Sequence, residues 1–318
     1  MIKKMLFATL VLSVAFPAAA QNWPAKPVRM LITFPPGGPS EILTRLVNER
    51  LQAALKQPFV VENRAGAGGN IGTDAVAKAA PDGYLFGITT DTLFTVNPAV
   101  YRRMPFDPWG DIRPVTLLGS FSQMMVCNAA VPAKTLAELL QLAKREKLSY
   151  ASGGPGVPGH LAAELLLSMA GASMLHVPYK GPAAATADVM GGQVNCGFLA
   201  TPTVLPHVKS GKLNGLAVST AQRSPLAPDV PAAAEAGAPG FDAPFYLVLF
   251  TQKGTPPEVS ALMNREVSKA LGDPEVKKRA AALDIVTLGG SPEEASRVLK
   301  AAAVKWAPVV ERIGLKLD

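Results

Sequence analysis

The alternation of apolar and polar positions predicts that strands and helices follow one another along most of the chain. Residues 28–34 have the apolar character of a buried strand, and residues 41–55 place Ile42, Leu43, Leu46, Val47, Leu51 and Leu55 on one helical face. Further strands are predicted at 58–62, 84–89, 115–119, 123–128, 148–151, 174–178, 194–199, 213–218 and 245–250. Helices are predicted at 72–80, 135–145, 183–191, 203–210 and 256–271, with a last one opening at Ser291. This alternation favours parallel sheets covered by helices on both faces.

Two long apolar runs divide this pattern. They lie near residues 115–128 and 241–250. Their separation suggests that the chain leaves a first lobe, builds a second lobe and then returns. Two such crossings would make a hinge.

Two glycine-rich turns stand between a predicted strand and a predicted helix. The first, residues 35–40, reads Pro-Pro-Gly-Gly-Pro-Ser, and the second, residues 152–159, reads Ser-Gly-Gly-Pro-Gly-Val-Pro-Gly. A strand, a glycine turn and a helix aim backbone N–H groups and the positive end of the helix at one point, which favours an anion. Two such turns suggest two lobes holding one small acid, although a glycine turn taken alone is more often only a turn. A third glycine-rich segment, residues 66–72, lacks the nucleotide-binding motifs and is interpreted as packing near the cleft rim.

The first 20 residues have the pattern of a cleaved signal peptide. Lys3 and Lys4 precede an apolar run of about 12 residues, and Ala18-Ala-Ala20 fits a small-residue cleavage site. The run is too short to span a bilayer. Cleavage would leave 298 residues with a net charge of +5, and no cysteine lies near the site to carry a lipid anchor. An exported, soluble protein is predicted, with an uncleaved anchor as the alternative.

Composition excludes several classes of function. The basic excess is mild, and its densest cluster, Lys277-Lys-Arg279, fits a solvated helix face better than a nucleic-acid patch. Two cysteines and three scattered histidines offer no metal-ligand spacing, and no cofactor motif is present. No nucleophile motif supports an enzyme. Cys127 and Cys196 lie in apolar, strand-like runs, which favours two buried thiols, with a disulfide left open.

Five segments, in chain order, resemble one known family. They are Phe34-Pro-Pro-Gly-Gly with Arg45, 61–72 with 79–84, 97–101 with Asp107, 176–181 with 191–194, and 219–239. Together they resemble the extracytoplasmic receptors of tripartite tricarboxylate transporters, the Bug-type periplasmic solute-binding proteins. The resemblance runs across essentially the whole chain after the signal peptide.

The resemblance implies an α/β, two-lobed periplasmic-binding-protein fold, in which each lobe is a mainly parallel sheet flanked by helices and two crossings form the hinge. The first lobe would comprise residues 21–120 and 242–318, and the second residues 121–241. The receptor would work as a monomer in the periplasm, capture a small organic acid and deliver it to the membrane permease subunits. A receptor for a signalling partner and, less favoured, a periplasmic enzyme are the alternatives.

The resemblance also implies where the ligand lies. One binding loop would be residues 34–41, with Phe34 at its start and donors from the N–H groups of Gly37, Gly38, Ser40 and Glu41 and from the Ser40 hydroxyl. The other would be residues 152–160, running from Ser152 to His160, with N–H donors from Gly153, Gly154, Gly156 and Val157. Thr90 and Asp91 would line the cleft. Charge-assisted contacts from several N–H groups can hold a carboxylate without an arginine.

The chain departs from the family pattern in three places. Glu41 replaces a frequent Asp, Val157 replaces a Ser or Thr, and Leu199-Ala200 stands where an Asp is common. These changes make the second-lobe side of the predicted pocket less polar. We therefore expect a ligand with an apolar or aromatic body and one carboxylate, rather than a citrate-like acid or a cationic amino acid.

Overall fold

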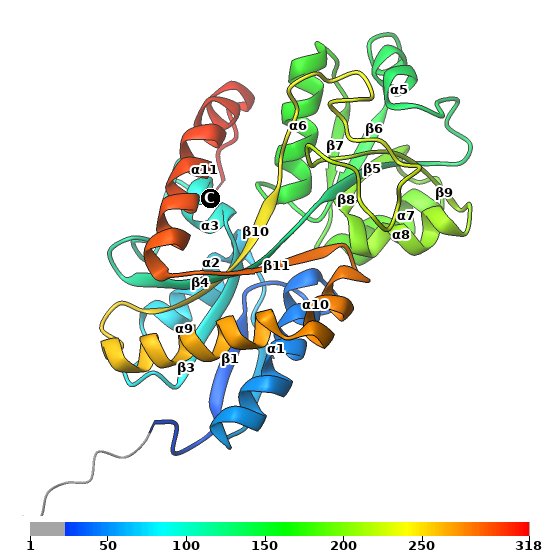
Figure 1. The fold of residues 1–318 in the computed structure, drawn as a ribbon. Helices are drawn as coiled ribbons and strands as arrows, with labels where there is room; N and C mark the ends of the chain where they lie inside the picture. The colour runs from blue at the N-terminus through cyan, green and yellow to red at the C-terminus, as the bar shows by residue number, and fades with distance from the viewer. Residues whose placement is uncertain (1–22, 318) are drawn as a thin grey trace, which may run out of the picture.

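The computed structural model describes residues 23–317 and contains two sheets flanked by helices (Figure 1). The first sheet comprises β1 (Val28–Ile32), β2 (Phe59–Asn63), β3 (Leu85–Thr90), β4 (Ile112–Phe121), β10 (Phe245–Gln252) and β11 (Ile285–Gly289). The second comprises β5 (Gln123–Asn128), β6 (Ser149–Ser152), β7 (Leu175–Pro178), β8 (Cys196–Ala200) and β9 (Leu213–Val218). The strand orders are β11-β4-β10-β3-β1-β2 and β7-β6-β8-β5-β9. Each sheet with its helices forms one lobe.

Helices occupy most of the connections between strands. Those of the first lobe are α1 (Pro39–Leu55), the short 3-10 helix η1 (Ala67–Gly69), α2 (Asn70–Ala77), α3 (Thr92–Thr95), α4 (Asn97–Val100), α9 (Pro257–Gly272), α10 (Pro274–Ala281) and α11 (Pro292–Ile313). Those of the second lobe are α5 (Leu136–Ala143), α6 (Pro158–Ala170), α7 (Pro182–Met190) and α8 (Thr201–Lys209). The predicted start of the last helix is confirmed, because Ser291 and Glu294 form a capping box at the start of α11. The predicted signal peptide lies outside the described residues.

The two-lobed α/β architecture expected from the sequence is confirmed, but both sheets are mixed. Parallel pairing holds for β1 with β2 and β3, and for β6 with β7 and β8. The pairs made by β10 and β5 are antiparallel, as is the pair of β11 with β4. A strand–helix–strand connection makes its two strands parallel neighbours. A strand that arrives from the other lobe lacks such a connection to its neighbours, so it can pair with them in the antiparallel direction.

The chain crosses between the lobes in two places. Ser122 alone separates β4 of the first sheet from β5 of the second, and residues 219–244 connect β9 back to β10. Asp284, just before β11, accepts hydrogen bonds from Ser122 (2.6 Å) and from Ser224. The Lys305 ammonium of α11 donates to the Asp242 carbonyl. Both crossings are therefore hydrogen-bonded to residues that follow β10, namely Asp284 and Lys305.

The preference for two buried thiols is wrong, because Cys127 and Cys196 form a disulfide. The two residues are direct partners in the antiparallel register of β5 and β8, with Cα atoms 3.9 Å apart. Both are fully buried. The apolar surroundings that suggested thiols are those of a sheet interior, and the pairing follows from a strand register that the local sequence does not reveal.

The last described residues lie against both lobes. Leu317 pairs with Tyr101 of the first lobe: its N–H donates to the Val100 carbonyl (2.7 Å), and its carbonyl accepts from the Arg102 N–H (3.0 Å). On its other side, the side chains of Leu315 and Leu317 come within 4 Å of the position that a Cβ on Gly156 would take. Among residues 23–317, no helix combines the length and apolar character needed to cross a bilayer.

Candidate functional site

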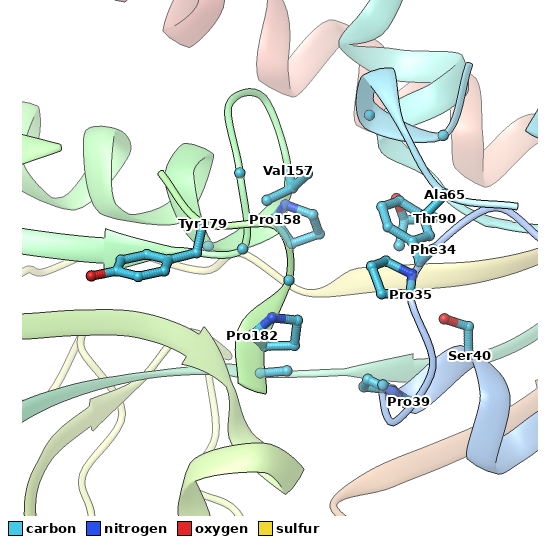
Figure 2. A pocket seen from close by; sticks show the side chains of 18 of the residues that line it. Phe34, Pro35, Pro39, Ser40, Ala65, Thr90, Val157, Pro158, Tyr179 and Pro182 are labelled. Atoms are coloured by element: carbon cyan, nitrogen blue, oxygen red, sulfur yellow. The ribbon is translucent and has the colours of Figure 1, made fainter. Parts of the chain in front are cut away.

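A cavity of about 510 Å³ lies between the lobes, with walls from both (Figure 2). This size falls within the range of small-molecule sites. Three helices, α1, α6 and α7, begin at residues that line it, namely Pro39, Pro158 and Pro182. Proline suits the first helical position, where an N–H would have no helical partner. The positive ends of three helices therefore meet at one cavity.

The first wall is the loop between β1 and α1, residues 34–41, here called loop 1. Gly37 takes a positive φ of 85°, which favours glycine, and Gly38 caps α1. The Gly37 N–H donates to Glu41 Oε2 at 2.8 Å, and the Glu41 N–H donates to the Gly38 carbonyl at 3.1 Å. The N–H groups of Gly38 and Ser40 have no partner among the described residues, and both residues line the cavity.

Glu41 acts as an internal anion for loop 1. The Gly37 N–H, and then the Arg45 guanidinium, hold the pKa of the Glu41 carboxyl below its usual range. Arg45 donates to Glu41 Oε1 from Nε (2.8 Å) and from Nη2 (2.6 Å). The carboxylate therefore fixes the turn while it stays outside the cavity lining.

The second wall is the loop between β6 and α6, residues 152–160, here called loop 2. Ser152 Oγ donates to the Gly154 carbonyl (2.9 Å) and accepts from the Gly154 N–H (3.2 Å). The Gly156 N–H donates to His160 Nδ1 at 3.0 Å. The N–H groups of Gly153 and Val157 have no partner within residues 23–317, and both residues line the cavity.

A stack of aromatic rings supports loop 2 from behind. The rings of His160 and His176 stack with centroids 4.0 Å apart, and the Tyr150 ring stacks on His176 at 5.0 Å. Burial lowers the pKa of His160 to about 3, aided by the neighbouring His176, and burial lowers the pKa of His176 to about 4. Both imidazoles are therefore neutral at ordinary pH. A neutral Nδ1 is what allows His160 to accept from the Gly156 N–H.

The lobes meet at the mouth of the cavity. A Cβ placed on Gly181 would lie 3.5 Å from Cγ of Pro35, so the turn before α7 touches loop 1 across the gap. Figure 2 shows Pro35 and Pro182 facing one another from the two lobes, while the Tyr179 ring points away. The Tyr179 hydroxyl donates to Asp188 at 2.6 Å. The two lobes therefore approach each other closely at this edge of the cavity.

The cavity lining is largely apolar and carries one charge among the described residues. Phe34, Phe121, Val157, Leu199 and Leu247 line it together with five prolines. Lys180 is the one ionisable side chain that is not a tyrosine, and its sign is positive; no carboxylate lines the cavity. Thr90, Gln123 and the Ser40 hydroxyl add neutral polar groups. The site can accept an anionic group attached to an apolar body.

The structure brings most of the predicted site residues to this cavity. Those that line it are Phe34, Gly38, Ser40, Thr90, Gly153, Gly154, Val157 and Leu199. Those that lie outside the lining are Gly37, Glu41, Asp91, Ser152, Gly156 and His160. Except for Asp91, the second group holds the two loops in shape through the hydrogen bonds described above.

Asp91 is fully buried at the end of β3, beside the cavity wall. Its Oδ1 accepts from the Tyr246 N–H at 3.1 Å, and its Oδ2 has no partner among the described residues. Burial raises the pKa of the Asp91 carboxyl to about 7. The residue links β3 to the crossing strand β10, because its own N–H also donates to the Tyr246 carbonyl at 3.0 Å.

Comparison of the chain with known proteins identifies the family to which it belongs. The family model described as "Tripartite tricarboxylate transporter family receptor" matches residues 43–315. The chain belongs to that receptor family. The family description is that of a receptor and not of an enzyme.

The receptor has relatives among both curated proteins and solved structures. It is 34% identical over 307 residues to Protein BugT of Bordetella pertussis, covering 96% of this chain and 94% of that one. "R. palustris Rpa4515 with adipate" has a TM-score of 0.89 at 32% identity, covering 93% of this chain and 99% of that chain. "MatC (Rpa3494) from Rhodopseudomonas palustris with bound malate" has a TM-score of 0.82 at 28% identity, covering 91% and 100% respectively.

The receptor's cavity also includes residues that the sequence analysis missed. The glycine-rich segment interpreted as rim packing contributes residues 66–69 to the wall, together with Ala65 just before it; residues 65–69 are here called the glycine loop. Its four consecutive positive φ values, from Gly66 to Gly69, form a backbone shape that mostly requires glycine. Phe121, Gln123 and Leu247 come from the crossing strands. The run of glycines was the available signal for the loop, whereas the crossing strands gave none beyond their apolar character.

Proposed function

We propose that this receptor captures a small carboxylate with an apolar body in the cavity between its lobes. The observation that carries the proposal is the convergence of three helix N-termini on an apolar cavity whose one lining charge is Lys180. The helix ends and the unpartnered N–H groups would stabilise a bound anion, and no lining carboxylate would repel it. The apolar walls contact the rest of the ligand.

The proposed donors are the N–H groups of Gly38 and Ser40 in loop 1, the Ser40 hydroxyl, and the N–H groups of Gly153 and Val157 in loop 2. Pro39 and Pro158 occupy the neighbouring positions and have no N–H to offer. Because the two loops belong to different lobes, a carboxylate that contacts both would bind the closed form more tightly than the open form. Binding would therefore shift the equilibrium toward the closed form. The crossings proposed as the hinge divide the chain into residues 21–120, 121–241 and 242–318.

The apolar walls refine the ligand class. Phe34, Phe121 and Leu247 surround the space beyond the loops, and Leu199 adds a further apolar side chain from the second lobe. The two structural relatives bind adipate and malate according to their names. For this chain we propose an acid whose carboxylate binds the loops and whose body is aliphatic or aromatic, while the exposed Lys180 contributes positive potential at the rim.

The setting that we propose follows from family membership. The receptor would be exported to the periplasm by its N-terminal segment and would act as a monomer. Its closed form would be recognised by the membrane permease subunits of a tripartite tricarboxylate-type transporter. Uptake of the identified acid by cells that carry or lack the receptor gene tests this step, since unchanged uptake would contradict it.

The test of the site is a ligand panel with matched variants. Adipate, malate, citrate and benzoate are added to the mature protein, and thermal unfolding is followed, because a ligand of the folded state raises the melting temperature. Acids with an apolar body should raise it, and citrate should not. Ser40→Ala should weaken the best acid about tenfold, the loss expected for one hydrogen bond to a charged group. Ser296→Ala on α11, at a residue that does not line the cavity, is the control. The proposal would be contradicted if citrate raised the melting temperature more than the acids with an apolar body do. It would also be contradicted if Ser40→Ala and Ser296→Ala bound the best acid equally well.

A further inference from the structure

A second cavity, of about 340 Å³, lies on the other side of the glycine loop. Ala67 lines both cavities, so the loop is the wall between them. The second cavity is bounded by one face of α2 and by residues 101–105, which follow α4. All of these elements belong to the first lobe. The lining of the cavity therefore includes no residue of the second lobe.

The charges around the second cavity are unbalanced. Its lining carries three cations, Arg64, Lys78 and Arg103, and one carboxylate, Asp74. Lys78 Nζ lies 2.6 Å from Asp74 Oδ1, which pairs these two charges along α2. The guanidinium groups of Arg64 and Arg103 have no hydrogen-bond or ion-pair partner among residues 23–317. Two unpartnered guanidinium groups thus line one cavity.

Neutral donors complete the lining. Asn97 Nδ2 donates to Asn70 Oδ1 at 2.8 Å, which orients the Asn70 amide and leaves its NH₂ group without a protein partner among the described residues. Tyr101 adds a hydroxyl. Guanidinium groups bind carboxylate and phosphate oxygens in pairs, and neutral N–H and O–H donors satisfy the remaining oxygens.

We propose that this second cavity binds a multiply charged oxyanion, a phosphate or a di-carboxylate, between Arg64 and Arg103. Arg64 directly precedes the glycine loop, and the Asn97 amide that orients Asn70 also donates to the Gly68 carbonyl at 3.1 Å. An anion bound to Asn70 would therefore be linked, through the Asn97 amide, to the wall of the main cavity. The site is separate from the ligand site of the proposed function and does not depend on it.

The test is calorimetric titration of the mature protein with inorganic phosphate and, separately, with succinate, at constant ionic strength set with chloride. These two probes distinguish an inorganic source of the oxyanion from an organic one. Arg64→Gln and Arg103→Gln should each weaken the bound anion by about tenfold or more, as expected for the loss of a charge-assisted hydrogen bond. Both side chains are exposed, so the folding of each variant is confirmed by its melting curve.

Two control variants make the result specific. Arg265→Gln removes an exposed arginine on α9 and should not change the affinity of this site by more than about twofold, whereas Lys180→Gln removes the cation of the main cavity and identifies any binding of a probe there. Binding that depends on Arg64 and Arg103 but not on these controls supports the proposal. Absence of binding by both probes at millimolar concentration overturns it. Equal weakening by Arg265→Gln, or binding that depends on Lys180 alone, also overturns it.

Discussion

Removing the disulfide tests how the second lobe is stabilised. The bond joins β5 to β8 and closes a loop with a sequence separation of 69 residues, which contains α5, β6, α6, β7 and α7. All of loop 2 lies inside that closed segment. The perturbation is the double variant Cys127→Ala and Cys196→Ala. Both positions are fully buried, and alanine introduces no unsatisfied polar group.

The expected magnitude follows from the length of the closed loop. The chain-entropy relation gives a stabilisation of about 4 kcal/mol at 25 °C for a loop of this length. A loss of that size lowers the melting temperature of the second lobe by roughly 15 °C. Ligand affinity should change little, since Cys127 lies about 13 Å along β5 from Gln123 at the cavity, at 3.3 Å per residue.

The assay compares urea unfolding of the oxidised wild type, the wild type with reductant, and the double variant. The reduced wild type and the variant should be destabilised by similar amounts, which separates the effect of the bond from that of the lost sulfur atoms. Calorimetry with the best acid of the panel checks the affinity. A variant that unfolds within about 1 kcal/mol of the oxidised wild type would refute the loop-entropy reasoning.

Three further predictions concern the site's supports. Gly159→Ala places a Cβ 2.0 Å from a backbone carbonyl of β8, so α6 must shift; we expect a loss of about 1–3 kcal/mol in urea unfolding, with Gly272→Ala, which meets no atom within 4 Å, as a near-neutral control. Because the pKa of His160 is lowered to about 3 in the folded state, the unfolded state takes up a proton at this residue as the pH falls below 6.5, while the folded state does not. Stability should therefore fall from pH 6.5 toward pH 4, and His160→Gln should reduce that slope; an unchanged slope would contradict the buried neutral imidazole. Asp91 has the opposite sign, because its pKa is raised to about 7: its contribution is present below pH 4 and is lost as the pH rises through 7. Asp91→Asn should therefore gain stability relative to wild type between pH 5 and pH 8, and a constant difference across that range would count against the shift.

Local signals in the sequence predicted much of the fold and of the two loops. A strand, a glycine turn and a proline at the first helical position specify the geometry of loops 1 and 2 over a few residues, and both loops line the cavity. The capping box of α11 is likewise contained within four residues. Where the determining contacts are close in sequence, the pattern of residues was sufficient.

The features that the sequence did not reveal depend on contacts between distant residues. The disulfide requires the register of β5 against β8, and the roles of the crossing-strand residues require the lobes to be assembled. Strand β11 escaped prediction because it is a short edge strand whose Val286 (63% exposed) and Leu288 (44% exposed) point to solvent. The sequence also could not tell which loop N–H groups are available to a ligand. Gly37 and Gly156 were both predicted as donors, but in the structure their N–H groups donate to the side chains of Glu41 and His160, which hold the loops in shape.

The C-terminal tail has a practical consequence for experiments on this receptor. Leu317 is hydrogen-bonded to the first lobe, and with Leu315 it approaches Gly156 at the tip of loop 2. A fluorescent reporter or affinity tag fused after residue 318, or attachment to a sensor chip through that end, would apply force where the lobes meet. Such a fusion would bias the opening of the cleft and distort measured affinities. Labels for binding studies therefore belong on an exposed position such as Arg265 on α9, away from both loops.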